Sequence, residues 1–220
     1  ILAKNMLLEG VNLDQVFRNT RAEVLKESGG NQRTEESTQL TGETFYLVQK
    51  TFKEDFIKID SLISESKYLE ALEITSAILE IDPTNKFALY QKGNIYMDYK
   101  SNFNKAIIDY KKALEIDTFY SDAYNALGIL FEENENYDKA IEYYNQAIKF
   151  EKDSSRKALF LANRGYVYFM LEKDTLAVND FNYSINLTPT SFKNYLVRAN
   201  FYIELGEYKL ALEDYSKCIE

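Results

Sequence analysis

The chain has 220 residues and a formal net charge of −9, because 35 acidic residues outnumber 26 Lys and Arg. Phosphate backbones require clustered Lys and Arg, and no basic run is visible, so we expect no nucleic-acid partner. The lack of histidine excludes Ser-His and Cys-His catalysis and leaves only carboxylates and one thiol for a zinc site. We therefore expect no catalytic residue, no metal and no cofactor in this chain.

The rest of the composition favours helices. With 45% hydrophobic residues, 18 Tyr, 8 Gly and 2 Pro, the chain suits long helices joined by short turns. No apolar run approaches the roughly 18 residues of a membrane span, so we expect no membrane partner. The single cysteine, Cys218, excludes an internal disulfide and predicts a reducing, cytoplasmic location.

The first 48 residues predict a separate segment. Asn12 and Gln15 form a capping-box pattern, a helical apolar stripe follows, and Gly29 and Gly30 supply a stop. The polar run NQRTEESTQLTGET predicts a loop, and TFYLV, which ends at Val48, predicts a short strand. We place the domain boundary just after Val48, which leaves residues 49–220 as a second domain.

A helical hairpin is predicted between residues 121 and 152, with the polar turn ENEN at its centre. Apolar residues recur there at steps of three and four, as on one face of a helix. Small residues at Gly128, Ala140 and Ala147 let two helices approach closely. Such a pair cannot bury its apolar face alone, so it requires copies of itself on either side.

Four further copies are present. Gly93, Gly165 and Ala199 occupy the place of Gly128, and a weaker first copy carries Tyr68, Ala71 and Ile78. We expect units at about residues 52–85, 86–120, 121–154, 158–191 and 192–220, the last incomplete. Extra residues at 99–102 and 154–157 are expected to fall in turns, where they cost little entropy.

This pattern resembles the tetratricopeptide repeat, whose period is about 34 residues. The resemblance covers residues 52–220 and implies an all-α fold, a right-handed superhelical array of about five antiparallel helix pairs. It also implies that a protein or peptide ligand binds in a concave groove lined by the first helix of each pair. The groove residues on that basis are Tyr90, Asn94, Asn125, Ile129, Glu132, Asn163, Tyr166, Phe169, Lys193, Leu196 and Asn200.

Four of these groove residues are asparagines, whose amides can donate to and accept from a peptide backbone. The alternative is that they are ordinary polar residues of a helix surface. Some family members hold a terminal carboxylate between basic residues, but here Lys193 stands alone beside Glu132. We therefore do not expect an acidic tail as the ligand.

Three other features are interpreted as structural. The residues from Glu132 to Glu135 are expected to form a solvated turn, and Cys218 a small buried side chain in a second helix. Recurring aromatic residues are expected to pack between helices. They are Tyr96, Tyr110, Phe131, Tyr144, Tyr168, Phe181, Tyr202 and Tyr215.

A second resemblance concerns residues 1–47, where a helix is followed by GGNQ, LTG and FYL. This order is similar to the C-terminal end of a bacterial caspase-like (peptidase C14) domain. In that family the catalytic His and Cys lie earlier in the chain, so no catalytic residue carries over to this sequence.

Together the two resemblances predict a non-catalytic interaction scaffold that recruits substrates or regulators to a caspase-like cysteine peptidase. Two alternatives stay open. The chain could be a fragment of an active cysteine endopeptidase whose His and Cys lie outside it, or a self-association module that forms a weak homodimer.

Overall fold

The computed structural model describes residues 52–100 and 102–219, which form helices joined by short turns. The helix, loop and strand expected before residue 49, and the boundary after Val48, lie outside these residues. Within the described ranges there is no strand, which confirms the all-α fold class. The helices are residues 52–64, α4 (Tyr68–Ile81), α5 (Lys86–Lys100), α6 (Phe103–Ile116), α7 (Ser121–Glu133), α8 (Tyr137–Phe150), α9 (Ser154–Met170), α10 (Asp174–Leu187), α11 (Phe192–Glu204) and α12 (Tyr208–Lys217).

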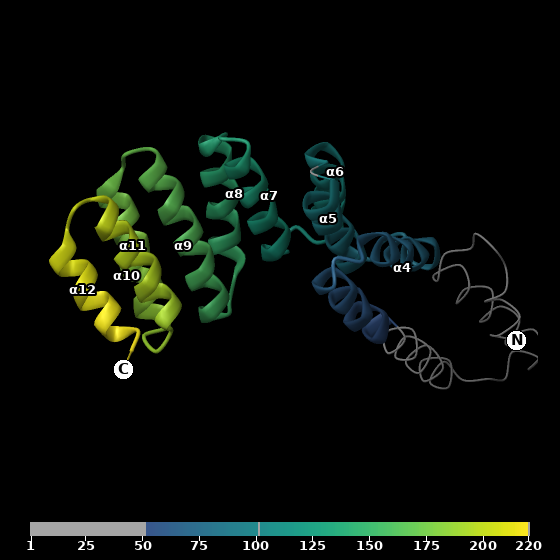
Figure 1. Ribbon diagram of the computed structural model, residues 1–220. Helices are drawn as coiled ribbons and strands as arrows, with labels where there is room; N and C mark the ends of the chain where they lie inside the picture. The colour runs from purple at the N-terminus through teal and green to yellow at the C-terminus, as the bar shows by residue number, and fades with distance from the viewer. Residues whose placement is uncertain (1–51, 101, 220) are drawn as a thin grey trace, which may run out of the picture. The chain divides into compact units, whose positions relative to one another are not determined.

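First and second helices alternate along the chain. The first helices are residues 52–64, α5, α7, α9 and α11, and a second helix follows each of them. Contacts divide the chain within α6 into two compact units, Ile1–Asp109 and Tyr110–Glu220. In the second unit, α7 and α8, α9 and α10, and α11 and α12 pack as antiparallel pairs (Figure 1).

Four turns between a first and a second helix, all within the described residues, share a left-handed residue at the same position. Ser66, Glu135, Glu172 and Gly206 each stand two residues before a second helix with φ of 59°, 57°, 56° and 76°. After α7, Glu135 N donates to Glu132 O and Asn136 N to Phe131 O, both at 2.8 Å. This is a Schellman motif, which satisfies the last carbonyls of the helix. Three of the four left-handed positions therefore hold a residue less suited than glycine.

The core of the first unit lies between helix 52–64, α4 and α5. Its buried side chains follow the three-and-four spacing expected from the sequence. They are Phe52, Ile59, Leu62, Ala71, Ile78, Ala88 and Ile95.

The core of the second unit depends on small residues opposite aromatic rings. A Cβ on Gly128 would lie 2.5 Å from Cε1 of Tyr144, and a Cβ on Gly165 would lie 2.8 Å from Cε1 of Phe181. Both rings are buried, as is Tyr110. The predicted packing role is confirmed for these three rings. The other five aromatic residues expected to pack between helices are half-buried: Tyr96, Phe131, Tyr168, Tyr202 and Tyr215.

Two ion pairs that the repeat pattern did not predict join first and second helices. Arg164 donates from Nε and Nη2 to both oxygens of Asp180 at 2.7 Å. Arg198 binds Asp214 in the same way at 2.8 and 2.6 Å, and both aspartates are buried. Each arginine also donates to an asparagine of the preceding second helix, Asn145 or Asn182. A planar guanidinium with two carboxylate bonds fixes the angle between helices better than a single point charge.

The buried carboxylate of Glu151 lies in the short connection between α8 and α9. Glu151 accepts hydrogen bonds from Ser121 Oγ at 2.7 Å, from the N–H groups of Lys152 and Asp153 at 2.8 and 2.9 Å, and it pairs with Arg156 at 3.1 Å. Burial alone would raise the pKa of Glu151. These donors outweigh burial and hold the pKa below its usual value.

Three expectations are corrected. Residues 154–157 were expected in a turn between helices but form the first turn of α9, because Asp153 accepts a hydrogen bond from Arg156 N at 2.9 Å and caps the helix there. Residues 99 and 100 were also expected in a turn but are the last two residues of α5. Cys218 is half-buried and follows the last residue of α12. Glu132 lies in the last turn of α7, where the hydroxyl of Tyr144 donates to it at 2.5 Å, so it is no part of a solvated turn.

Candidate functional site

The candidate site is, in each unit, the face of the first helices that carries the predicted groove residues. Residues at steps of three, four and seven share one helical face. On α9 this face carries Leu159, Asn163, Tyr166 and Met170. On α11 it carries Lys193, Leu196, Asn200 and Ile203, and on α7 it carries Asp122, Asn125, Ile129 and Glu132. We call this surface the first-helix face.

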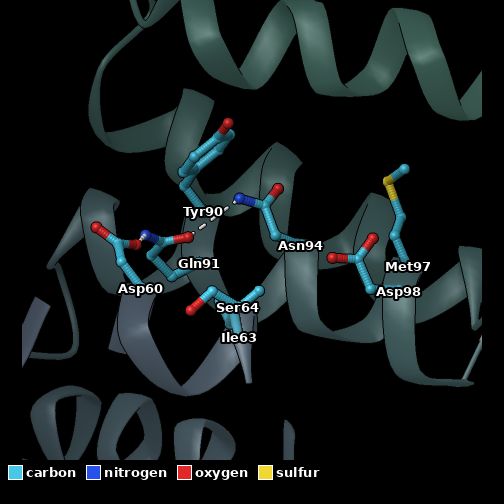
Figure 2. Close-up of a pocket in the computed structure, with 8 residues that line it drawn as sticks. All are labelled: Asp60, Ile63, Ser64, Tyr90, Gln91, Asn94, Met97 and Asp98. Carbon is cyan, nitrogen blue, oxygen red and sulfur yellow. Dashed lines mark hydrogen bonds between the residues drawn. The ribbon is translucent and has the colours of Figure 1, made fainter. Parts of the chain in front are cut away.

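In the first unit the first-helix face contains an open hollow of about 420 Å³ between helix 52–64 and α5. Figure 2 shows side chains of both helices around it. Two predicted groove residues, Tyr90 and Asn94, are among those that line it. The lining residues are Asp60, Ile63, Ser64, Tyr90, Gln91, Asn94, Met97 and Asp98.

A chain of hydrogen bonds crosses this hollow. Asn94 Nδ2 donates to Gln91 Oε1 at 3.1 Å, and Gln91 Nε2 donates to Asp60 Oδ1 at 2.6 Å (Figure 2). Partial burial raises the pKa of the Asp98 carboxyl beside it. The hollow thus offers amide groups and two carboxyl groups, which suit N–H donors and cationic groups.

In the second unit an amide pair joins α7 to α9. Asn163 Nδ2 donates to Asn125 Oδ1 at 3.1 Å, so two predicted groove residues lie next to each other. This bond uses one donor and one acceptor, and it leaves each amide further hydrogen-bonding capacity.

Glu132 on the same face is tied to the core. Burial raises the pKa of Glu132, and the negative charge of Glu133 raises it further. The hydrogen bond from the Tyr144 hydroxyl lowers this pKa, but by less than burial raises it. Burial and the nearby carboxylate also raise the pKa of the Tyr144 phenol, which keeps it a donor. The hydrogen bond between Tyr144 and Glu132 therefore links a buried core residue to a residue of the first-helix face.

The remaining predicted residues differ in their surroundings. Phe169 is half-buried, and its ring meets that of Phe201 edge-on at 5.5 Å, so it belongs partly to the core. Asn200 accepts a hydrogen bond from Tyr215 Oη at 2.7 Å. Tyr166 and Leu196 are exposed, as is Lys193.

Sequence reasoning omitted several residues of the face. Asp60 and Gln91 line the hollow, and Leu159, Met170 and Ile203 are exposed apolar side chains on α9 and α11. Gln91, Leu159, Met170 and Ile203 each lie three or four residues from a predicted residue of the same helix, so extending that spacing over each first helix would have found them. Asp60 is on helix 52–64, for which no groove residue was predicted.

The described part of the chain has neither a candidate metal site nor a helix that could span a membrane. Residues 52–100 and 102–219 contain no cluster of His, Cys, Asp and Glu that could hold a metal ion. Within the same ranges no helix has both the length and the apolar character needed to cross a bilayer.

Alternating helices with small residues at the crossings and a shared polar and apolar face define a helical-repeat array. Family models agree. Residues 121–154 match one model of the tetratricopeptide repeat, and residues 88–120 and 192–220 match a second. These matches support the tetratricopeptide repeats that the spacing predicted.

Curated relatives match half or more of the chain. Human DnaJ homolog subfamily C member 7 is 29% identical over 174 residues, which cover 73% of this chain and 35% of that protein. Human serine/threonine-protein phosphatase 5 is 29% identical over 110 residues, or 50% of this chain and 20% of that protein. The chain thus spans about a third or less of these relatives.

Solved structures share the fold. Pseudomonas aeruginosa pilF has a TM-score of 0.68 at 20% identity, over 78% of this chain and 77% of that one. YrrB, described as a TPR protein with an unusual peptide-binding site, has a TM-score of 0.53 at 20% identity, over 78% and 90%. At these identities the likeness establishes the fold alone.

Proposed function

We propose that this chain is a non-catalytic protein-interaction array that binds a peptide or partner protein on its first-helix face. One observation carries the proposal: in each unit, neighbouring amide side chains lie together on that face, on one helix in the first unit and on two neighbouring first helices in the second. Gln91 and Asn94 line the hollow of the first unit, and Asn125 and Asn163 are bonded in the second.

Paired amides suit an extended ligand. Each primary amide has two N–H donors and a carbonyl acceptor, and a peptide backbone offers one of each per residue. The array can therefore hold a backbone without demanding a particular sequence. A protein of the same fold, YrrB, is described as having an unusual peptide-binding site.

Replacing Asn125, Asn163 and Asn200 together with alanine tests the proposal. The probe is a peptide selected from a random 16-residue library displayed on phage against the full chain, then synthesised with a fluorescent label. We expect the triple variant to bind it at least about tenfold more weakly, since each lost hydrogen bond is worth roughly 0.5–1.5 kcal/mol.

A matched control uses asparagines of a second helix. Asn179 and Asn186 are exposed on α10, so changing both to alanine should leave the affinity as it is. Equal affinity of the triple variant and the wild type, with unchanged melting temperatures, would refute the proposal.

We further propose that the ligand is a substrate or regulator of a caspase-like cysteine peptidase joined to this array. Support comes from the resemblance of residues 1–47 to the end of such a domain. Tethering would raise the local concentration of the captured protein near the active site. The lone thiol of Cys218 suits the reducing cytoplasm, where we place this activity.

Determining the sequence upstream of Ile1 tests this link. A strand ending in His-Gly and another ending near a Cys would support a cysteine endopeptidase. Absence of both would leave the array as an interaction or self-association module, and the second possibility predicts a mass that rises with protein concentration in light scattering.

A further inference from the structure

Large apolar side chains are exposed on the first-helix face of α9 and α11. Leu159, Tyr166 and Met170 on α9 are 53%, 46% and 42% exposed, and Leu196 and Ile203 on α11 are 38% and 39% exposed. On each helix these residues are separated by four or seven positions, so they form a stripe on one side. Clustered apolar exposure of this kind marks an interaction surface.

The two helices that carry these stripes are neighbours. Phe169 and Phe201 join α9 to α11, with ring centroids 5.5 Å apart. From Leu159 to Met170 the α9 stripe is about 16 Å long at the rise of about 1.5 Å per residue. An apolar surface of this length on two parallel helices matches two to three turns of a further helix.

Negative charge at one edge of this surface favours a partner with basic residues. Because antiparallel second helices separate them, α7, α9 and α11 run in the same direction, and their C-terminal ends share an edge. Exposed Glu133 and Glu204 stand at that edge, and within the described residues neither forms an ion pair. The partial negative charge of helix C-termini adds to theirs. Exposed Lys193 lies at the opposite, N-terminal edge.

We propose that this surface, within residues 110–219, binds an amphipathic helix of a partner protein. The bound helix carries apolar residues at i, i+3, i+4 and i+7, and Lys or Arg where it meets the C-terminal edge. The inference rests on the proposed function and specifies its ligand. The apolar stripes bind the helix, the asparagine amides bond polar side chains of the ligand or extended residues that flank its helix, and the glutamates select against acidic partners.

Phage selection from the same random 16-residue library on the full chain provides the probe. Selected peptides are expected to combine apolar residues at helical spacing with adjacent Lys or Arg. The dissociation constant of the best labelled peptide should rise at least about tenfold in Tyr166→Ser and in Leu196→Ser, because each variant removes apolar surface that the bound peptide would bury.

Two further comparisons sharpen the test. Leu176→Ser and Tyr183→Ser on α10 serve as controls, because these residues are 45% and 51% exposed on a second helix, and both variants should bind as the wild type does. Glu133→Lys with Glu204→Lys should weaken the peptide several-fold at low salt and less at high salt, because exposed charges are screened.

Each adverse outcome has a distinct meaning. Peptides that lack apolar residues, or that keep their affinity in the Tyr166 and Leu196 variants but lose it in the asparagine triple variant, would overturn this inference and leave the proposed function standing. Peptides insensitive to every first-helix variant would overturn both. A concentration-dependent dimer mass that Tyr166→Ser abolishes would assign the surface to a second copy of the chain instead of a partner helix.

Discussion

Replacing Gly128 with alanine tests the packing that shapes the best-formed repeat. The new Cβ would lie 2.5, 2.6 and 2.9 Å from Cε1, Cδ1 and Cζ of Tyr144. Carbon atoms in contact normally stand about 3.5–4.0 Å apart. The Tyr144 ring is fully buried and its hydroxyl is bonded to Glu132 at 2.5 Å, so it cannot turn aside.

Two opposing effects set the magnitude. Alanine is favoured over glycine within a helix by about 1 kcal/mol. Overpacking a core costs about 1–3 kcal/mol, and three ring atoms approached at once place this site near the upper end. We expect Gly128→Ala to lower the free energy of unfolding by about 2 kcal/mol in urea titrations followed by circular dichroism at 222 nm.

A double-mutant cycle isolates the clash. In a Tyr144→Leu background the ring is gone, so Gly128→Ala should be neutral or slightly stabilising. Gly206→Ala is the control: its φ is 76° and nothing lies within 4 Å of the added Cβ, so its cost of about 1 kcal/mol should be the same in both backgrounds. If Gly128→Ala is equally harmful with and without Tyr144, the packing argument is wrong.

Further predictions follow from the turns, the ion pairs and the buried carboxylate. Glu135→Gly and Glu172→Gly should each stabilise the chain by about 1 kcal/mol, seen as higher melting temperatures, because both residues have positive φ; unchanged values would contradict this. Arg198→Ala should cost about 3 kcal/mol in urea unfolding by leaving Asp214 buried and unpaired, and Asp214→Asn in that background should recover part of the loss. The pKa of Glu151 is lowered in the folded chain, so its contribution is present above the ordinary Glu pKa of about 4.3 and is lost as pH falls below that through the folded value. Glu151→Gln should therefore flatten the fall in melting temperature below about pH 4.3, and an unchanged pH profile would refute the assignment.

The fold was accessible from sequence because its main constraint is local and repeated. The pair of Gly128 and Tyr144 has a counterpart in Gly165 and Phe181 at the same spacing in the sequence. Such a repeated pair of a glycine and an aromatic residue predicts where two helices cross. The start of α9 was missed because Asp153 caps the helix there, a single local contact that the repeat pattern does not contain.

Polar partners were harder to predict. The Arg164 and Asp180 pair lies 16 residues apart in sequence, and only the angle between two helices decides that they meet. Glu132 belonged to an acidic run that favoured solvent, yet its bond to Tyr144 draws it toward the core. Helical spacing predicts which face of its helix a residue occupies. It does not predict which residue of another helix lies opposite, because that depends on how the helices pack.

The candidate site shows the same division. Spacing placed Asn125 and Asn163 on one face, but not their mutual hydrogen bond. Tyr166 and Leu196 were among the predicted groove residues, but Leu159, Met170 and Ile203 were not, because apolar residues at helical spacing resemble ordinary core positions until their exposure is known. Exposure depends on what the neighbouring helices cover, and a single sequence does not supply that.

One cross-linking measurement tests the central claim that partners bind the first-helix face. Benzoylphenylalanine is placed at Tyr166 on α9 or, in a separate protein, at Tyr183 on α10, two tyrosines that are 46% and 51% exposed. The selected peptide is added and the sample irradiated. The account predicts a covalent adduct from position 166 and none from position 183. An adduct from position 183 alone, or equal adducts from both, would contradict it.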